Sequence, residues 1–215
     1  MRLFSAVSIF CLLFVQSSFC QQPAVFVKNL KVEGLVEMNG LEHMHPRLSW
    51  QIVSQKRDVN QKSYQILVAS SLNKINQHIG DVWNSRNIES PASINVAYTG
   101  ANLLSGRQYY WKVRVWTNKG SSHWSAPGKW SMGILDSSLW EARWIGFEKV
   151  SGNEKPDTVF TRLAARYLRK EVAVKARPVR ATGYICGLGL YELYLNGKKV
   201  GNAVLAPTVK EYNKA

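Results

Sequence analysis

Short segments in which apolar and polar residues alternate recur from Val25 onward, separated by turn-forming residues. In the clearest, residues 109–116, one face carries Tyr109, Trp111, Val113 and Val115, and the other carries Tyr110, Lys112, Arg114 and Trp116. Residues 47–53, with Leu48, Trp50 and Ile52 on one face, also predict a strand, and residues 64–69 predict the next one. Alternation of apolar and polar residues with a period of two, repeated over many short segments, is typical of an all-β sandwich. We therefore predict an all-β fold with Trp50 and Trp111 in the core and Trp116 on the opposite face.

One segment breaks the alternation. Leu72, Ile75 and Ile79 recur near helical spacing, and Ser71 precedes them in a position suited to an N-cap. Gly80 follows, where a glycine can end a helix. Residues 71–80 therefore predict one short connecting helix.

A polar stretch rich in turn-forming residues, 151–157, separates two modules. We predict a first sandwich over 25–137, a linker over 138–160 and a second module over 161–215. In the second module, residues 167–174, 179–186 and 190–195 read as strands, and Asn196–Gly197 predicts a type I′ hairpin turn. A sandwich usually needs about seven strands and roughly 100 residues, so we expect the second module to be incomplete.

The N-terminus has the layout of an export signal. Arg2 precedes an apolar run over residues 3–15, and a short polar stretch follows. A permanent membrane span needs roughly 20 apolar residues, so we expect no transmembrane segment and cleavage of a signal peptide, residues 1–20. The protein is then exported, to the periplasm, the cell surface or the medium. Two alternatives remain: a lipid anchor on Cys20, which bulky Phe19 disfavours, and a buried N-terminal strand.

The amino-acid composition limits the classes of molecule that the protein could bind. The 215 residues include 28 Lys and Arg against 14 Asp and Glu, a formal charge of +14, which suggests nucleic acid, anionic glycan or membrane phosphate. Basic residues such as Lys112, Arg114 and Lys129 alternate with apolar ones, as on the solvated faces of strands, so we expect no nucleic-acid partner. Cys11 and Cys20 belong to the leader, which leaves Cys186 alone and excludes an internal disulfide. We predict a buried, inert thiol there.

A search for catalytic chemistry yields no catalytic and no metal-binding residue. The carboxylates are scattered over different turns and strands, whereas glycoside hydrolysis needs two that face one sugar. His43 and His45 could hold a metal, but no third ligand lies near them in the sequence. Trp116, Trp124 and Tyr191 are placed for exposure and could stack on sugars, although core or interface roles are favoured for such residues.

Several ordered motifs resemble the N-terminal region of bacterial α-L-rhamnosidases. They are Pro-Arg-Leu-Ser-Trp at 46–50, Tyr-Gln-Ile-Leu-Val-Ala at 64–69, Gly-Asp-Val-Trp-Asn-Ser at 80–85, the strand at 109–116, and segments 140–146 and 187–201. The resemblance runs from about Val32 to Tyr212. Leu103, Gly106 and Tyr109 also sit as in fibronectin type III domains, where the tyrosine hydroxyl pins the turn entering its strand. The resemblance implies an immunoglobulin or fibronectin type III-like first module and, for the second, the start of a jelly-roll-like rhamnosidase N-terminal domain.

In the resembled enzymes these modules precede a helical (α/α) barrel whose paired glutamates hydrolyse terminal α-L-rhamnosyl bonds with inversion. Nothing in this sequence corresponds to that barrel, so no catalytic residue is carried over. The resemblance implies an exported, non-catalytic portion of an α-L-rhamnosidase for scaffolding and substrate recognition. Its partners would be rhamnose-containing glycans and the remainder of the enzyme. The alternative is a free-standing carbohydrate-binding or adhesive β-sandwich protein.

The second module resembles a domain that assists substrate recognition, in some relatives with calcium. No cofactor is evident in the sequence itself, and calcium is implied by the resemblance only. Tyr191, Glu192 and Asn196 match the preserved motif and are the candidate carbohydrate contacts. Asn196 also has a sufficient structural reason in the predicted hairpin turn.

Overall fold

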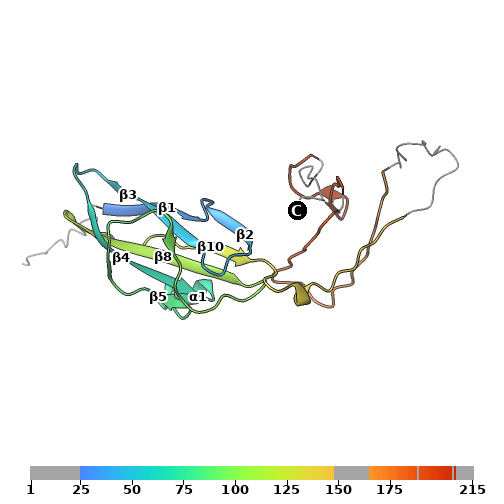
Figure 1. Ribbon diagram of the computed structural model, residues 1–215, viewed down its shortest axis with the longest axis horizontal. Coiled ribbons are helices and arrows are strands. Elements are labelled where there is room, and N and C mark those ends of the chain that lie inside the picture. Colours follow the sequence, from blue (N-terminus) through green and yellow to red (C-terminus); the bar gives the residue numbers. More distant parts are fainter. Residues whose placement is uncertain (1–24, 148–164, 188, 205, 207–215) are drawn as a thin grey trace, which may run out of the picture. The chain divides into compact units, whose positions relative to one another are not determined.

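The computed structural model describes residues 25–147, 165–187, 189–204 and 206 (Figure 1). The signal-peptide and Cys20 predictions lie outside these residues. The chain divides between Ala142 and Arg143 into two compact units, each described here by itself. No helix in the described part of the chain is long and apolar enough to cross a membrane.

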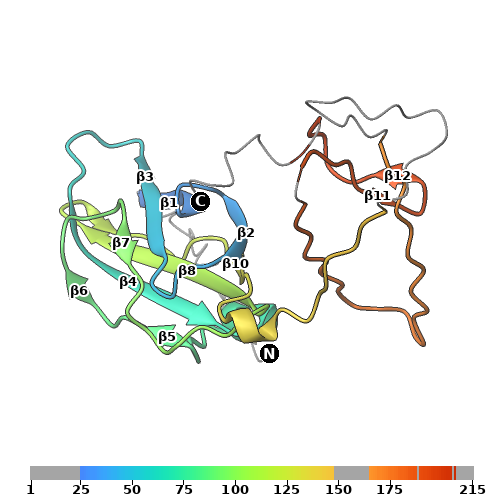
Figure 2. The ribbon, with the colours of Figure 1, turned by 45° about the vertical axis from the view of Figure 1, so that its right-hand side comes forward.

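The first unit is a sandwich of two sheets (Figures 1 and 2). The smaller sheet has the order β1 (Val25–Val32), β3 (Arg47–Ser54) and β7 (Val96–Ala97). The larger has the order β2 (Glu37–Leu41), β10 (Gly128–Met132), β8 (Gln108–Thr117), β4 (Gln61–Ala69) and β5 (Trp83–Asn84). Two further strands, β6 (Ile88–Glu89) and β9 (Gly120–Ser121), pair with β4 and β8. β2 runs parallel to β10, and the other pairs are antiparallel.

The core lies between the two sheets, and period-two alternation accounts for its composition. Trp111 on β8 has 0% of its surface exposed and Trp50 on β3 has 2%, which confirms the prediction for both. The Trp50 indole donates to Gln61 Oε1 at 3.1 Å, so its polar atom is satisfied inside the core. Trp116, on the other face of β8, is half-buried.

The turn entering β8 is fixed by a tyrosine. The Tyr109 hydroxyl accepts a hydrogen bond from the Leu104 backbone N–H at 2.9 Å. Gly106 lies between them with φ of 66°, a conformation that glycine adopts without steric cost. The arrangement expected from the resemblance to fibronectin type III domains is therefore present.

The short helix α1 (Leu72–Asn76) forms where the sequence predicts it, on the face of the larger sheet away from β1 and β3 (Figure 1). Ser71 caps it by accepting a hydrogen bond from the Lys74 backbone N–H at 3.3 Å. The predicted end at Gly80 is wrong, because the chain leaves the helix at Gln77 and His78 takes the left-handed conformation, with φ of 62°. Gly80 serves close packing instead, since a Cβ there would lie 2.5 Å from the Trp83 carbonyl oxygen.

Residues 135–139 leave the sandwich through a short 3-10 helix, η1 (Ser137–Leu139). The Asp136 side chain caps it by accepting from the Ser138 backbone N–H at 2.9 Å. The division between the two units follows three residues later.

The described part of the second unit contains one hairpin, β11 (Tyr194–Leu195) and β12 (Lys198–Lys199) (Figure 2). Asn196 and Gly197 have φ of 48° and 76°, the positive pair that a type I′ turn requires, so this turn is confirmed. Residues 167–174 and 179–186 are not strands, contrary to the prediction. A strand needs a neighbouring strand for its backbone groups, and no strand pairing among the described residues includes either segment, although their side chains have β-type composition. Cys186 is exposed, so the prediction of a buried thiol is wrong.

Candidate functional site

The candidate carbohydrate contacts of the second unit lie around the β11–β12 hairpin. Glu192 accepts hydrogen bonds from the Lys199 ammonium at 2.5 Å and from the Tyr194 hydroxyl at 2.9 Å. These bonds, with that from Lys199 the stronger influence, lower the pKa of the Glu192 carboxyl. Glu192 is therefore an ionised acceptor whose lone pairs are largely engaged within the hairpin.

Tyr191 and Asn196 have separate local roles. The backbone of Tyr191 pairs with Ala206, with N to O distances of 2.6 and 3.0 Å. Its ring lies against Gly187, where a Cβ would come within 2.5 Å of Tyr191 Cδ1. Asn196 is exposed at the first position of the turn. Among the described residues no group of three His, Cys, Asp or Glu is arranged to hold a metal ion.

The prediction that the basic residues on the outer face of β8 are solvated is wrong for Lys112. It alternates with apolar residues as a surface lysine would, yet only 3% of its surface is exposed because α1 packs over it. Its ammonium donates to the Ile75 carbonyl oxygen and lies 2.5 Å from His78 Nδ1. Lysine has donors only, so Nδ1 must accept, which requires that it carry no proton.

The ring of Trp124 lies close to three basic side chains, those of Lys112, Arg114 and His78. The Trp124 indole lies 5.4 Å from the Lys112 ammonium, 4.8 Å from the Arg114 guanidinium and stacks on His78 at 5.9 Å. Arg114 also lies over Trp116 at 4.7 Å. Partial desolvation of its ring, and then the charges of Lys112 and Arg114, lower the pKa of His78, although much of the residue is exposed, and burial lowers the pKa of Lys112. This cluster holds α1 on the sheet and is largely occupied with its own contacts.

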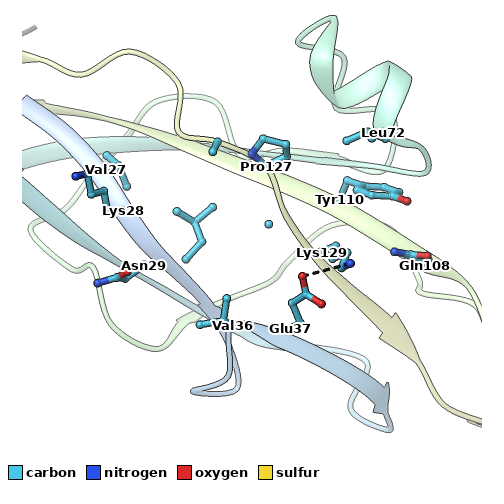
Figure 3. Close-up of a pocket in the computed structure, with 13 residues that line it drawn as sticks. Val27, Lys28, Asn29, Val36, Glu37, Leu72, Gln108, Tyr110, Pro127 and Lys129 are labelled. Carbon is cyan, nitrogen blue, oxygen red and sulfur yellow. Dashed lines mark ion pairs between the residues drawn. The ribbon is translucent and has the colours of Figure 1, made fainter.

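A more accessible site lies at the edge of the sandwich, in a groove of about 660 Å³ (Figure 3). We call it the edge groove. Several elements contribute to its lining. They are residues 27–30 of β1, Val36 just before β2, Glu37 at the start of β2, Leu72 of α1, Gln108 and Tyr110 of β8, and residues 126–129. Lys129 and Glu37 form an ion pair of 3.2 Å there. In Figure 3 this pair, Gln108 and Tyr110 lie toward one end of the groove, and Lys28 and Asn29 toward the other.

The sequence interpretation missed the edge groove because its residues come from segments up to about a hundred positions apart. Only tertiary folding brings β1, β2 and β8 together there. One signal was available: Tyr110 occupies the outward face of the best-predicted strand, where a large aromatic ring has no place in the core.

Comparison with known families identifies both parts of the chain. Residues 27–136 match the Rha78A-like, N-terminal immunoglobulin domain. Residues 176–215 match the α-L-rhamnosidase N-terminal domain. The first match covers most of the described sandwich, and the second includes the β11–β12 hairpin.

Individual relatives agree with these matches. An α-L-rhamnosidase of Formosa agariphila is 39% identical over 188 residues, which are 81% of this chain and 20% of the relative. An α-L-rhamnosidase of Alteromonas sp. is 33% identical, over 86% of this chain and 20% of its own length. The chain thus spans about a fifth of the length of these relatives.

A solved structure has the same fold as the sandwich. The Streptomyces avermitilis α-L-rhamnosidase, crystallised with L-rhamnose, superposes with a TM-score of 0.55 at 40% identity. The superposition covers 57% of this chain and 12% of the Streptomyces protein. The chain therefore belongs to the family of Rha78A-like N-terminal immunoglobulin domains and corresponds to the N-terminal region of α-L-rhamnosidases.

Proposed function

We propose that this chain is the exported, non-catalytic N-terminal portion of an α-L-rhamnosidase, which acts on terminal α-L-rhamnosyl residues. In that enzyme it would serve as a scaffold and take part in recognising rhamnose-containing glycans. The observation that carries the proposal is the match of two consecutive domains to the N-terminal region of proteins named α-L-rhamnosidase, over about a fifth of their length. Arg2 and the apolar run that follows it support export.

The carboxyl groups of the described residues support a non-catalytic role. A glycosidase general acid needs a raised pKa and a second carboxylate opposite it. The carboxyl pKa values that depart from ordinary are lowered, by hydrogen bonds, at Glu33, Asp81, Asp136 and Glu192. Three of these groups are paired with a basic side chain: Glu33 with Arg47, Asp81 with Lys74, and Glu192 with Lys199.

An activity assay tests the non-catalytic assignment. The purified chain, given an aryl α-L-rhamnoside, should release the aryl group at the rate of buffer alone. A full-length α-L-rhamnosidase from Streptomyces avermitilis serves as the positive control. Hydrolysis that co-purifies with the chain and disappears when one carboxylate is replaced by its amide would refute the assignment.

A further inference from the structure

The edge groove exposes several large apolar side chains. Val36 and Leu72, on opposite walls, have 61% and 46% of their surfaces exposed. Pro127, which is also exposed, contributes to the same lining. An apolar depression of this size with a few polar groups is the usual form of a small-molecule site.

Tyr110 gives this depression a flat aromatic wall. Its ring packs on one side against the small cluster of Leu67, Ala69 and Ile75, which holds it in place on the outer face of β8. The ring is only half-buried and contributes to the groove lining (Figure 3). A tyrosine held in this way offers an apolar face with a polar tip, at a small cost in side-chain entropy on binding.

The polar groups at the same end suit hydroxyl ligands. Lys129 and Glu37 have 44% and 59% of their side chains exposed, so their ion pair adds little to folding stability. The Lys129 ammonium has three donors and the Glu37 carboxylate has about four lone-pair positions, more than their single contact uses. Gln108 adds an amide beside them. Donors and acceptors of both kinds are therefore available next to the Tyr110 ring.

From this combination we propose that the edge groove binds a 6-deoxyhexose residue, such as a rhamnosyl unit of the glycan. The pyranose ring stacks on Tyr110, its hydroxyls hydrogen-bond Lys129, Glu37 and Gln108, and its methyl group enters the apolar part of the groove. The choice of sugar rests on the proposed function. The site itself rests on the groove and lies in the immunoglobulin-like unit, apart from the candidate contacts of the hairpin.

Saturation-transfer NMR on the purified full chain tests the proposal, with methyl α-L-rhamnopyranoside as ligand. Methyl α-L-mannopyranoside is the matched ligand, since it differs only by a hydroxyl on the methyl carbon. We expect a Kd on the order of 1 mM for the rhamnoside, with the strongest saturation at its C6 methyl protons. Loss of one buried methyl contact should weaken the mannoside about fourfold.

Variants locate the site. Tyr110→Leu should raise the Kd roughly tenfold, whereas Tyr110→Phe, which keeps the ring, should stay within about twofold. Val36→Asp places a charge in the apolar part of the groove at an exposed position, so it should abolish binding without a folding defect. Trp116→Leu is the matched control, because Trp116 is a half-buried aromatic residue on the same face of β8 but outside the groove.

Three results would each overturn the proposal: no saturation of either glycoside, equal affinity for both, or an unchanged Kd in Val36→Asp and Tyr110→Leu. Concentration-dependent self-association that the Val36→Asp substitution abolishes would assign the groove to a second copy of the chain instead. The hydrolysis assay does not involve the groove. A negative binding experiment therefore leaves the non-catalytic assignment standing, and a positive hydrolysis assay leaves the binding result standing.

Discussion

Trp111 occupies the middle of the buried face of β8, between the two sheets. Replacing it with alanine removes a side chain that is wholly enclosed and leaves a cavity that its neighbours cannot fill. We expect Trp111→Ala to lower the free energy of unfolding by about 3 to 5 kcal/mol, a large part of the stability of a domain this size. Urea titration followed by circular dichroism measures this loss.

Trp116→Ala is the comparison for that measurement. Trp116 lies on the outer face of the same strand, half-buried, with Arg114 over its ring. Its removal should cost far less, about 1 kcal/mol for the lost cation–π contact and packing. If both substitutions cost the same small amount of stability, the assignment of Trp111 to the buried face of β8 and of Trp116 to its outer face is wrong.

We expect His78 to make the first unit less stable in moderate acid. Its pKa is lowered in the folded protein, so the unfolded chain binds the proton more readily. The contribution of His78 to the free energy of unfolding is therefore fully present above the pKa of histidine in the unfolded chain, about 6.5. It is lost as the pH falls from that value through the lower pKa of His78 in the folded protein. Protonation would also set a donor against the Lys112 ammonium, 2.5 Å away.

We therefore expect the free energy of unfolding to fall between pH 7 and pH 5, and His78→Gln to reduce that fall. Glutamine still offers Lys112 an acceptor but does not titrate. His123→Gln is the control, because His123 is a second exposed histidine on the neighbouring loop and is not the imidazole that lies against Lys112. Thermal unfolding at each pH measures the effect. The same pH dependence in the wild type and His78→Gln would rule out this role for His78.

At the scale of elements, β8 and the turn before it organise the larger sheet. β8 pairs with β4, β9 and β10, and its entry is held by the hydrogen bond from Leu104 to Tyr109. Tyr109→Phe leaves the packing of the ring but deprives the Leu104 N–H of its acceptor. We expect a loss of about 1 to 3 kcal/mol in a urea titration.

Tyr110→Phe is the matched substitution, one residue along on the outer face. It removes the same hydroxyl from a half-buried ring, so it should change stability by less than about 0.5 kcal/mol. If both variants lose the same stability, the hydrogen bond to Leu104 is not what fixes the turn.

The elements that could be predicted from the sequence are those whose pattern is set by a shared core. β3 and β8 each turn one apolar face toward the shared core, so alternation revealed these strands and placed Trp50 and Trp111 inside. The Ser71 cap and the Asn196–Gly197 turn were also predictable, because each depends on local backbone chemistry.

Features that depend on distant partners could not be predicted. Residues 167–174 have the composition of a strand but are not paired with another strand in the described part of the chain. Lys112 has the sequence pattern of a surface lysine, but α1 covers it. The edge groove belongs to the same class, since no single segment carries its pattern. Tyr191, Glu192 and Asn196 stay predictions as carbohydrate contacts.

At the scale of the whole molecule, the chain joins an immunoglobulin-like unit to a unit that matches the α-L-rhamnosidase N-terminal domain. Both belong to the N-terminal fifth or so of much longer relatives. The described residues of the second unit leave large apolar side chains such as Tyr167, Val172 and Val179 exposed. The proposed role is therefore tested most directly inside one of these longer relatives.

The central claim is that this chain provides the N-terminal scaffold of an α-L-rhamnosidase. In the Streptomyces avermitilis enzyme, the segment equivalent to residues 27–136 can be exchanged for the sequence of this chain, which is 40% identical over the aligned region. The exchanged enzyme should fold and hydrolyse an aryl α-L-rhamnoside at a rate within about tenfold of the parent, and the same exchange carrying Trp111→Ala should not. A folded, soluble exchanged enzyme without rhamnosidase activity would contradict the claim.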